Sequence, residues 1–260
     1  MLVCFDSFQF HFSSLGTCSV RPNVQSSCVC VCVCVRAFFP RLCSDHISGA
    51  PHLKSKYFPN AQICIGSCIT QVQRTFNEIF NLTNVSGTGS EFDRLFADGA
   101  EFKVGSLTFQ VMHTPGHTPA CACYIVGDAI FTGDTIFHST MGTARCDFPG
   151  GSAEQMYRSV QRILALPAET RIYWAHDYPG TNREFAWGTT VAEVKANNKH
   201  IKDGIDAKAY ITMRETRDAQ LNPPGLLYPS LQTNVRAGLL PDPESNGTRF
   251  LKTPIFPAEE

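Results

Sequence analysis

Apolar residues recur every three or four positions in several stretches of the chain, which is the spacing of one buried helix face. The spacing is clearest in Ile69–Phe80 and Ser152–Leu166, and Ser152 can cap the second helix. Three further stretches show the same period. We expect them to form helices over residues 49–57, 190–200 and 207–219, with proline-rich coil after the last one.

Other stretches carry short apolar runs or strict alternation of apolar and polar residues, and these predict strands. Two hairpins are expected, with turns at residues 105–106 and 127–128. Single strands are expected over residues 62–66 and 171–175. Helices interspersed with hairpins favour an α/β sandwich over a parallel Rossmann sheet.

The chain has 260 residues, of which 43% are apolar and 17% are charged, enough for one domain with a substantial core. Its formal net charge is −1, which gives no sign of a nucleic-acid or anionic-membrane partner. No apolar run approaches the roughly 20 residues of a membrane-spanning helix. Beyond residue 43 the sparse cysteines are typical of a reduced intracellular enzyme, in the cytoplasm or the mitochondrion.

Residues 1–44 do not have the pattern of a folded segment. Residues 28–35 alternate Cys and Val, which a translated GT repeat would also produce. We interpret residues 1–44 as an aberrant, disordered segment joined to a domain of residues 45–260, and a continuous, abundant transcript across the junction would contradict this. A transit peptide should be rich in arginine, and Cys-x-Cys alternation lacks the spacing of structural zinc sites, so both alternatives are weaker.

Histidine and aspartate stand at the ends of apolar runs in three places. His117 follows a Pro-Gly turn, Asp134 follows a second run, and His176 ends a third. A carboxylate between apolar residues is costly to bury unless a cation or hydrogen bonds compensate it. With the upstream pair Asp45 and His46, this mixture of imidazole and carboxylate donors predicts a zinc or iron site at the edge of a sheet.

Three segments, in this order, resemble metal-binding motifs of the metallo-β-lactamase superfamily: Met112–Thr118, Thr132–Thr135 and Ala175–Asp177. The loop Gly142–Gly151 resembles a loop of the persulfide dioxygenases, in particular their bacterial-type branch, with the glyoxalase II hydrolases as more distant relatives. The resemblance covers about residues 45–254 and implies an αββα sandwich. Sequence ahead of the motifs normally supplies the first strands of this fold, and we expect those strands to be missing here.

The resemblance also implies roles for individual residues. It makes His117, Asp134, His176, Asp45 and His46 metal ligands. It gives catalytic duty to Asp45, His46 and His176.

Residues around these ligands are expected to support them. Arg145 is expected to contact the substrate, whereas Asp147, Asp177 and His113 are expected to hold the site through hydrogen bonds. Cys146 is expected to be inert, because nothing in the sequence indicates a depressed pKa for its thiol. Three histidines are expected on the surface: His52, His138 and His200.

The chain departs from the superfamily at its leading motif. That motif reads His-x-His-x-Asp-His, whereas the same six positions here read Arg41-Leu-Cys-Ser-Asp-His46. In the dioxygenases the first of these histidines binds the single iron, together with the equivalents of His117 and Asp134. Arg41 would repel a divalent ion, so we expect a weakened iron site. The Asp-His half of the motif, with the aspartate and last histidine of the later motifs, corresponds to the second metal position of the two-metal hydrolases and can hold zinc.

The resemblance therefore implies an enzyme that oxidises glutathione persulfide to sulfite and glutathione at a mononuclear Fe(2+). Its partner would be glutathione persulfide or a related thiol, and its oligomeric state is left open. The alternative is a zinc-dependent thioester hydrolase of the glyoxalase II type, in which a metal-activated water attacks the carbonyl. A third reading is a truncated product without activity.

Overall fold

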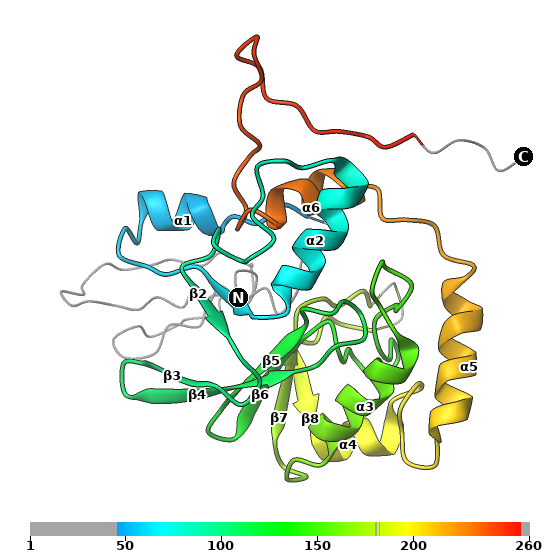
Figure 1. Cartoon of the computed structure of the whole chain (residues 1–260). Helices are drawn as coiled ribbons and strands as arrows, with labels where there is room; N and C mark the ends of the chain where they lie inside the picture. Colours follow the sequence, from blue (N-terminus) through cyan, green and yellow to red (C-terminus); the bar gives the residue numbers. More distant parts are fainter. Residues whose placement is uncertain (1–45, 180, 182, 256–260) are drawn as a thin grey trace, which may run out of the picture.

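The computed structural model describes residues 46–179, 181 and 183–255, and its largest element is a six-stranded sheet (Figure 1). The strand order β3-β4-β5-β6-β7-β8 follows the chain. The interpretation of residues 1–44, the missing first strands and the predicted ligand Asp45 lie outside the described residues. The strands are β3 (Glu101–Val104), β4 (Leu107–His113), β5 (Ala122–Val126), β6 (Ala129–Gly133), β7 (Arg171–Trp174) and β8 (Gly188–Thr190).

Strand direction brings three chain segments to one edge of this sheet. Neighbours pair antiparallel except β6 and β7, which are parallel and are connected through α3 (Ala153–Leu164). Because β4 and β6 both run antiparallel to β5, the strands β4, β6 and β7 point the same way. Residues that follow these three strands therefore meet at the edge formed by their C-terminal ends.

One face of the sheet is covered by α3, α4 (Val191–Asn197) and α5 (Ala207–Asp218) (Figure 1). Val160 of α3 and Tyr210 of α5 belong to the same buried cluster as Ile130 of β6 and Ile172 of β7. The central strands β5 and β6 are buried at almost every position, as expected for strands covered on both faces.

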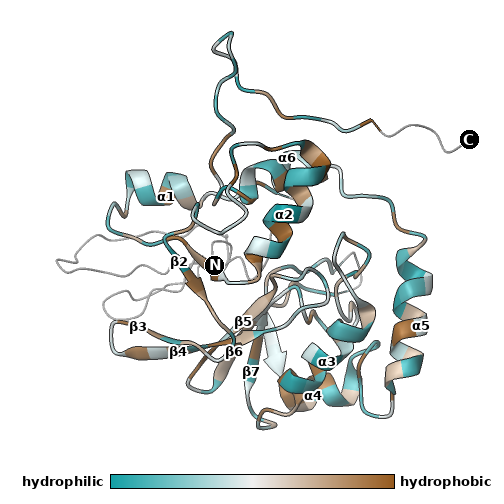
Figure 2. Ribbon diagram, viewed as in Figure 1, coloured by the Kyte–Doolittle hydropathy of each residue, from teal (hydrophilic) through white to brown (hydrophobic). Residues whose placement is uncertain are grey.

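The other face is covered by a smaller sheet and a second group of helices. β1 (Cys64–Gly66) and β2 (Arg94–Phe96) pair in parallel, and Phe96 of β2 stacks on Phe102 of β3 with ring centroids 4.6 Å apart. Ile65 of β1 packs with α2 (Ile69–Phe80) and α6 (Leu227–Asn234), while α1 (Ala50–Lys56) lies beside them (Figure 1). Figure 2 shows mixed brown and teal on the helices and more continuous brown on β5. The layers are helix, sheet, sheet and helix, so the expected αββα sandwich is confirmed.

The predicted helices and hairpins are present. Each of the five predicted helices forms to within a few residues of the expected bounds, and both hairpins turn where expected. Ser152 caps α3, since its side chain accepts a hydrogen bond from the N–H of Gln155. Among the helices of the described part, none has the length and apolar composition needed to cross a membrane.

Three elements are not indicated by the sequence pattern. The expectation of coil after residue 219 is wrong where α6 forms, because α6 has no apolar stripe and buries Ser230, Thr233 and Asn234. Pro229 lies in its first turn, where a missing N–H is tolerated. The strands β2 and β8 have only three residues each, too few to show a period.

Candidate metal centre

Three predicted ligands lie at the C-terminal edge of the sheet and line one cavity. His117 follows β4, Asp134 follows β6 and His176 follows β7, and all three side chains line a cavity of about 280 Å³. Phe148 and Tyr178 also line this cavity. Strand direction thus brings together residues that are up to 59 positions apart in the chain.

The turn between β4 and His117 depends on a glycine. Gly116 has φ +146, and a Cβ there would stand 2.4 Å from the Cα of Met156 in α3. The carbonyl of Gly116 accepts a hydrogen bond of 2.8 Å from the N–H of Ser152, the cap of α3. Only glycine fits this approach, so the Pro-Gly turn fixes where His117 leaves the strand.

The ring of His117 is held on two sides. Its Nδ1 lies 2.6 Å from the carbonyl oxygen of Arg145, and the ring of Phe148 meets it edge-on at 5.1 Å. The residue is only 2% exposed. A carbonyl can only accept, so Nδ1 donates the hydrogen and Nε2 carries the lone pair that a metal ion would use.

Asp134 and His176 contact each other. The Nδ1 of His176 lies 2.8 and 3.0 Å from the two carboxylate oxygens of Asp134, which is 5% exposed. The ring of His46 lies edge-on to that of His176 with centroids 5.8 Å apart. Asn234 of α6 donates to the carbonyl of His46 at 3.0 Å, so a helix missed by the sequence analysis holds this predicted ligand in place.

The donor types at this cavity fit a zinc or iron ion, because two imidazoles and a buried carboxylate surround it. Within the described ranges, no group of three or more His, Cys, Asp or Glu residues is drawn together closely enough to hold a metal ion. His117, Asp134 and His176 alone therefore do not make a complete site, and the fourth and fifth predicted donors are His46 and the undescribed Asp45.

Arg145 lies on the wall of the same cavity, paired with Asp147. Its Nε and Nη2 donate to the Asp147 carboxylate at 2.6 and 2.5 Å, and its Nη1 donates to the carbonyl of Asn222 at 2.8 Å. The hydrogen bond to Asp147 raises the pKa of Arg145 above its ordinary value. Burial alone would raise the pKa of Asp147, but the hydrogen bond from Arg145 holds it below its ordinary value. The guanidinium is thus oriented before any substrate arrives.

Three other predicted residues make contacts outside the cavity. The His113 ring lies 3.0 Å from the carbonyl of Phe96 through Nε2 and 3.7 Å from the Cys68 sulfur through Nδ1. Asp177 forms an ion pair with Arg183 and accepts a hydrogen bond of 2.8 Å from the N–H of Ala186. These contacts hold the loop after β7. Burial raises the pKa of the Cys146 thiol well above its ordinary value, which fits an inert cysteine.

The prediction of a surface position is wrong for His200, which is 5% exposed. Its Nδ1 accepts a hydrogen bond of 3.0 Å from the N–H of Thr143, in the loop that follows β6. Burial, and then the positive charges of Arg214, Lys199 and Arg217, lower the pKa of His200 to about 3, so it stays a neutral acceptor. None of these cations was singled out from the sequence.

Comparison with known proteins bears on the same region. The family model of the Metallo-beta-lactamase superfamily matches residues 44–176, a range that includes all three predicted ligands at the cavity. Glyoxylase B2 of Dictyostelium discoideum is 49% identical over 82% of this chain and 73% of its own length. A probable metallo-hydrolase of Burkholderia pseudomallei is 45% identical over 82% of this chain and 75% of its own length. The crystal structure of ETHE1 from Myxococcus xanthus has a TM-score of 0.61 and 29% identity, and the match covers 77% of this chain and 76% of that one.

Proteins of this superfamily bind divalent metal ions and are generally enzymes. The matched residues include His117, Asp134 and His176, the three donors that the sheet edge gathers around one cavity. The chain belongs to the metallo-β-lactamase superfamily.

Proposed function

We propose that this chain is a persulfide dioxygenase-like enzyme that oxidises glutathione persulfide to sulfite and glutathione at a single Fe(2+). The observation that carries the proposal is the loop Gly142–Gly151, whose Arg145 and Phe148 line the cavity of His117 and Asp134. In the balanced reaction, dioxygen supplies two oxygen atoms of sulfite and water the third. The sulfur–sulfur bond breaks, the outer sulfur is oxidised, and glutathione leaves as a thiol.

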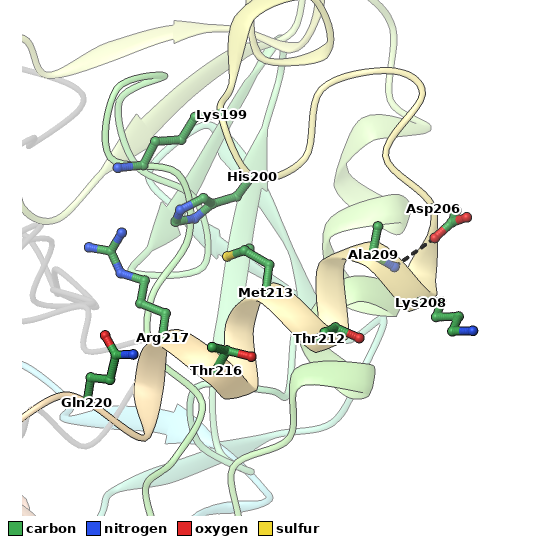
Figure 3. Close-up of a pocket in the computed structure, with 10 residues that line it drawn as sticks. All are labelled: Lys199, His200, Asp206, Lys208, Ala209, Thr212, Met213, Thr216, Arg217 and Gln220. Atoms are coloured by element: carbon green, nitrogen blue, oxygen red, sulfur yellow. Dashed lines mark hydrogen bonds between the residues drawn. The ribbon is translucent and has the colours of Figure 1, made fainter.

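The charges around the cavity suit an anionic substrate. Lys199 and Arg217 both line the 280 Å³ cavity and a neighbouring one of about 860 Å³, so they lie on the wall between the two. In Figure 3, Lys199 and Arg217 extend to the same side, with His200 between them. Burial, and then the nearby charges of Arg217 and Arg214, lower the pKa of Lys199. The carboxylates of a glutathione derivative would find positive charge beside the metal cavity.

Different residues at the cavity would bind the metal ion, orient its ligands and line the space beside it. His117 and Asp134 would hold the iron, which when bound supplies the activation of dioxygen. His176 and His46, with Asp45 of the sequence motif, are the further predicted ligands and correspond to the second metal position of the two-metal hydrolases. Asp134 accepts the Nδ1 proton of His176 and so fixes the orientation of that ring. Phe148 and Tyr178 line the cavity beside these ligands.

Arg145 and Asp177 would act on the substrate and on the loop beside the cavity. Arg145 is committed to Asp147, so it would offer the substrate the remaining face of its guanidinium. Asp177 would keep the loop of Tyr178 in place through Arg183.

The proposal is tested by metal analysis and oxygen uptake on the purified chain. It predicts that the bound metal is iron, at less than one ion per chain because of Arg41, with oxygen consumption on glutathione persulfide and one sulfite formed per dioxygen. The Burkholderia pseudomallei relative is a probable metallo-hydrolase, which favours a hydrolase as the second candidate. The resemblance to the glyoxalase II hydrolases makes that candidate a zinc-dependent thioester hydrolase. Bound zinc, cleavage of a glutathione thioester and no oxygen uptake would favour that candidate over ours.

The leading motif offers a gain-of-function test. We propose that Arg41, in the place of a superfamily histidine, weakens iron binding in this chain. The double substitution Arg41→His and Cys43→His should raise iron occupancy and oxygen uptake together. Full iron occupancy with Arg41 in place would show that the assignment of the leading motif is wrong. A chain that stays metal-free and inactive after both substitutions would support the reading as a product without activity.

We also propose a reducing compartment, the cytoplasm or the mitochondrion. Cys64, Cys68, Cys123 and Cys146 are all free thiols. Such usage is typical of compartments that keep cysteines reduced.

A further inference from the structure

Helix α5 carries a buried ion pair that faces the loop of the candidate site. Arg214 is 2% exposed and Asp218 is 4% exposed, and the Arg214 Nη2 lies 2.6 Å from an Asp218 oxygen. Tyr210, one turn earlier, is also buried on this face. Two charges removed from water are costly unless further hydrogen bonds satisfy them, so the other partners of the pair are informative.

The further bonds of this face go to one short segment, Thr143–Cys146. Arg214 Nη1 donates to the carbonyl of Thr143 at 3.1 Å, and Asp218 accepts from the N–H of Cys146 at 2.7 Å. The Tyr210 hydroxyl lies 2.8 Å from the hydroxyl of Thr143. The ion pair therefore forms hydrogen bonds with both ends of the segment Thr143–Cys146, whose third residue is Arg145.

His200 also restrains this segment at its N-terminal end. Gly142 has φ +89, and a Cβ there would stand 2.0 Å from the Nδ1 of His200. That Nδ1 accepts from the N–H of Thr143. The backbone between residues 142 and 146 thus has little freedom, and the carbonyl of Arg145 points where α5 and His200 hold it.

That carbonyl is the group that accepts the Nδ1 hydrogen of His117. We propose that Arg214 and Asp218 are positioning residues for His117. They hold the Arg145 carbonyl so that His117 keeps its hydrogen on Nδ1 and presents Nε2 to the metal ion. The inference rests on the proposed role of His117 as a metal ligand. Residues that orient a metal-binding histidine typically contribute 10–100-fold to metal affinity.

The test uses a pair of substitutions that removes the hydrogen bonds of the ion pair and keeps a packed core. Buried ion pairs can often be replaced by apolar residues of similar size without loss of stability, so Arg214→Met with Asp218→Leu should fold. In the full chain, two quantities are measured: the zinc dissociation constant by competition with a chelator, and the His117 tautomer by long-range proton–nitrogen NMR. We expect zinc binding to weaken about 10–100-fold. We also expect the Nδ1–H signal of His117 to be lost or broadened.

A matched control lies on α3. Glu154 and Arg158 form an ion pair with the same four-residue spacing, 59% and 73% exposed. The substitutions Glu154→Leu and Arg158→Met should leave both the zinc affinity and the His117 signal unchanged.

The outcomes separate this inference from the proposed function. A folded Arg214→Met/Asp218→Leu chain with unchanged zinc affinity and tautomer would overturn the inference, and so would His117→Ala with unchanged zinc affinity. If the double variant fails to fold, Asp218→Asn keeps the volume and removes the charge, and the same two readouts decide. Absence of oxygen uptake on glutathione persulfide, with zinc affinity and tautomer responding as expected, would refute the proposed function and leave the positioning role standing.

Discussion

The two edges of the six-stranded sheet differ in how far their charged pairs are exposed to solvent. At the edge where β4, β6 and β7 begin, tight turns join the strands, and Asp128 pairs with Arg171 at 2.6 Å while both stay more than half exposed. At the opposite edge, Asp134 and His176 make a contact of 2.8 Å with side-chain exposures of only 5% and 18%. The same kind of pair is solvated at one edge and withdrawn from water at the other.

This difference in exposure bears on where the proposed metal site lies. An exposed ion pair contributes little to stability, since water and salt screen it. A buried carboxylate is costly and needs a compensating charge or hydrogen bonds. His176 compensates part of this cost at the C-terminal edge, and we propose that a bound cation supplies the rest.

The largest effect should follow from removing the buried carboxylate. Asp134→Ala should weaken binding of zinc or iron at least a hundredfold, because structural zinc sites bind with roughly 10–16 kcal/mol shared among about four ligands. Metal content after gel filtration and chelator competition measure this. The matched substitution Asp128→Ala at the other edge should leave metal binding unchanged. Equal metal content in both variants would show that the two edges do not differ in metal binding.

Acid should destabilise the C-terminal edge through His200. Its pKa falls from 6.5 to about 3 on folding, so the folded state disfavours the proton and the stability is present above pH 6.5 and lost as pH falls toward 3. By pH 5 the loss should be about 2 kcal/mol. Urea unfolding at pH 7 and pH 5 should show a smaller loss for His200→Asn than for the natural chain. Identical losses would show that His200 does not titrate as its surroundings imply.

The wall between the two cavities should control substrate affinity. Arg217→Ala should raise the KM for glutathione persulfide about tenfold with kcat unchanged, since a charged hydrogen bond contributes roughly 1.5–3 kcal/mol. Lys208 lines only the larger cavity, so Lys208→Ala is the control and should leave KM unchanged. A fall in kcat without a change in KM would contradict a binding role.

The smallest effect is expected for Arg171→Ala. This side chain is held by Asp128 at the solvated edge. Neither the melting temperature nor metal content should change measurably. A marked loss of either would mean that the two edges are not as distinct as their exposures suggest.

Much of the site could be predicted because its ligands directly follow apolar runs. His117, Asp134 and His176 each end a strand or its turn, and strand ends are visible in the sequence. That β4, β6 and β7 point the same way depends on the sheet pairing, which one sequence does not show. Their convergence could be expected from the donor types and from the resemblance, and not from any pattern that shows strand pairing.

The supporting residues could not be predicted because their pattern has a more common meaning. Arg214 and Asp218, four positions apart on a polar helix, have the pattern of a solvated surface pair, and only the packing of α5 on the loop reveals their burial. Helix α6 was missed for a related reason. Its buried Gln232 and Asn234 satisfy their amides with the backbone of Lys252, Ser48 and His46, so polar side chains stand where an apolar stripe would be expected.

The central claim is that His117 and Asp134 bind one metal ion. Its most direct test is anomalous diffraction at the iron absorption edge, from crystals grown with Fe(2+) in the absence of oxygen. We predict one peak at about 2 Å from the Nε2 of His117 and about 2 Å from a carboxylate oxygen of Asp134. No peak at this cavity, or a peak bound by neither residue, would contradict it.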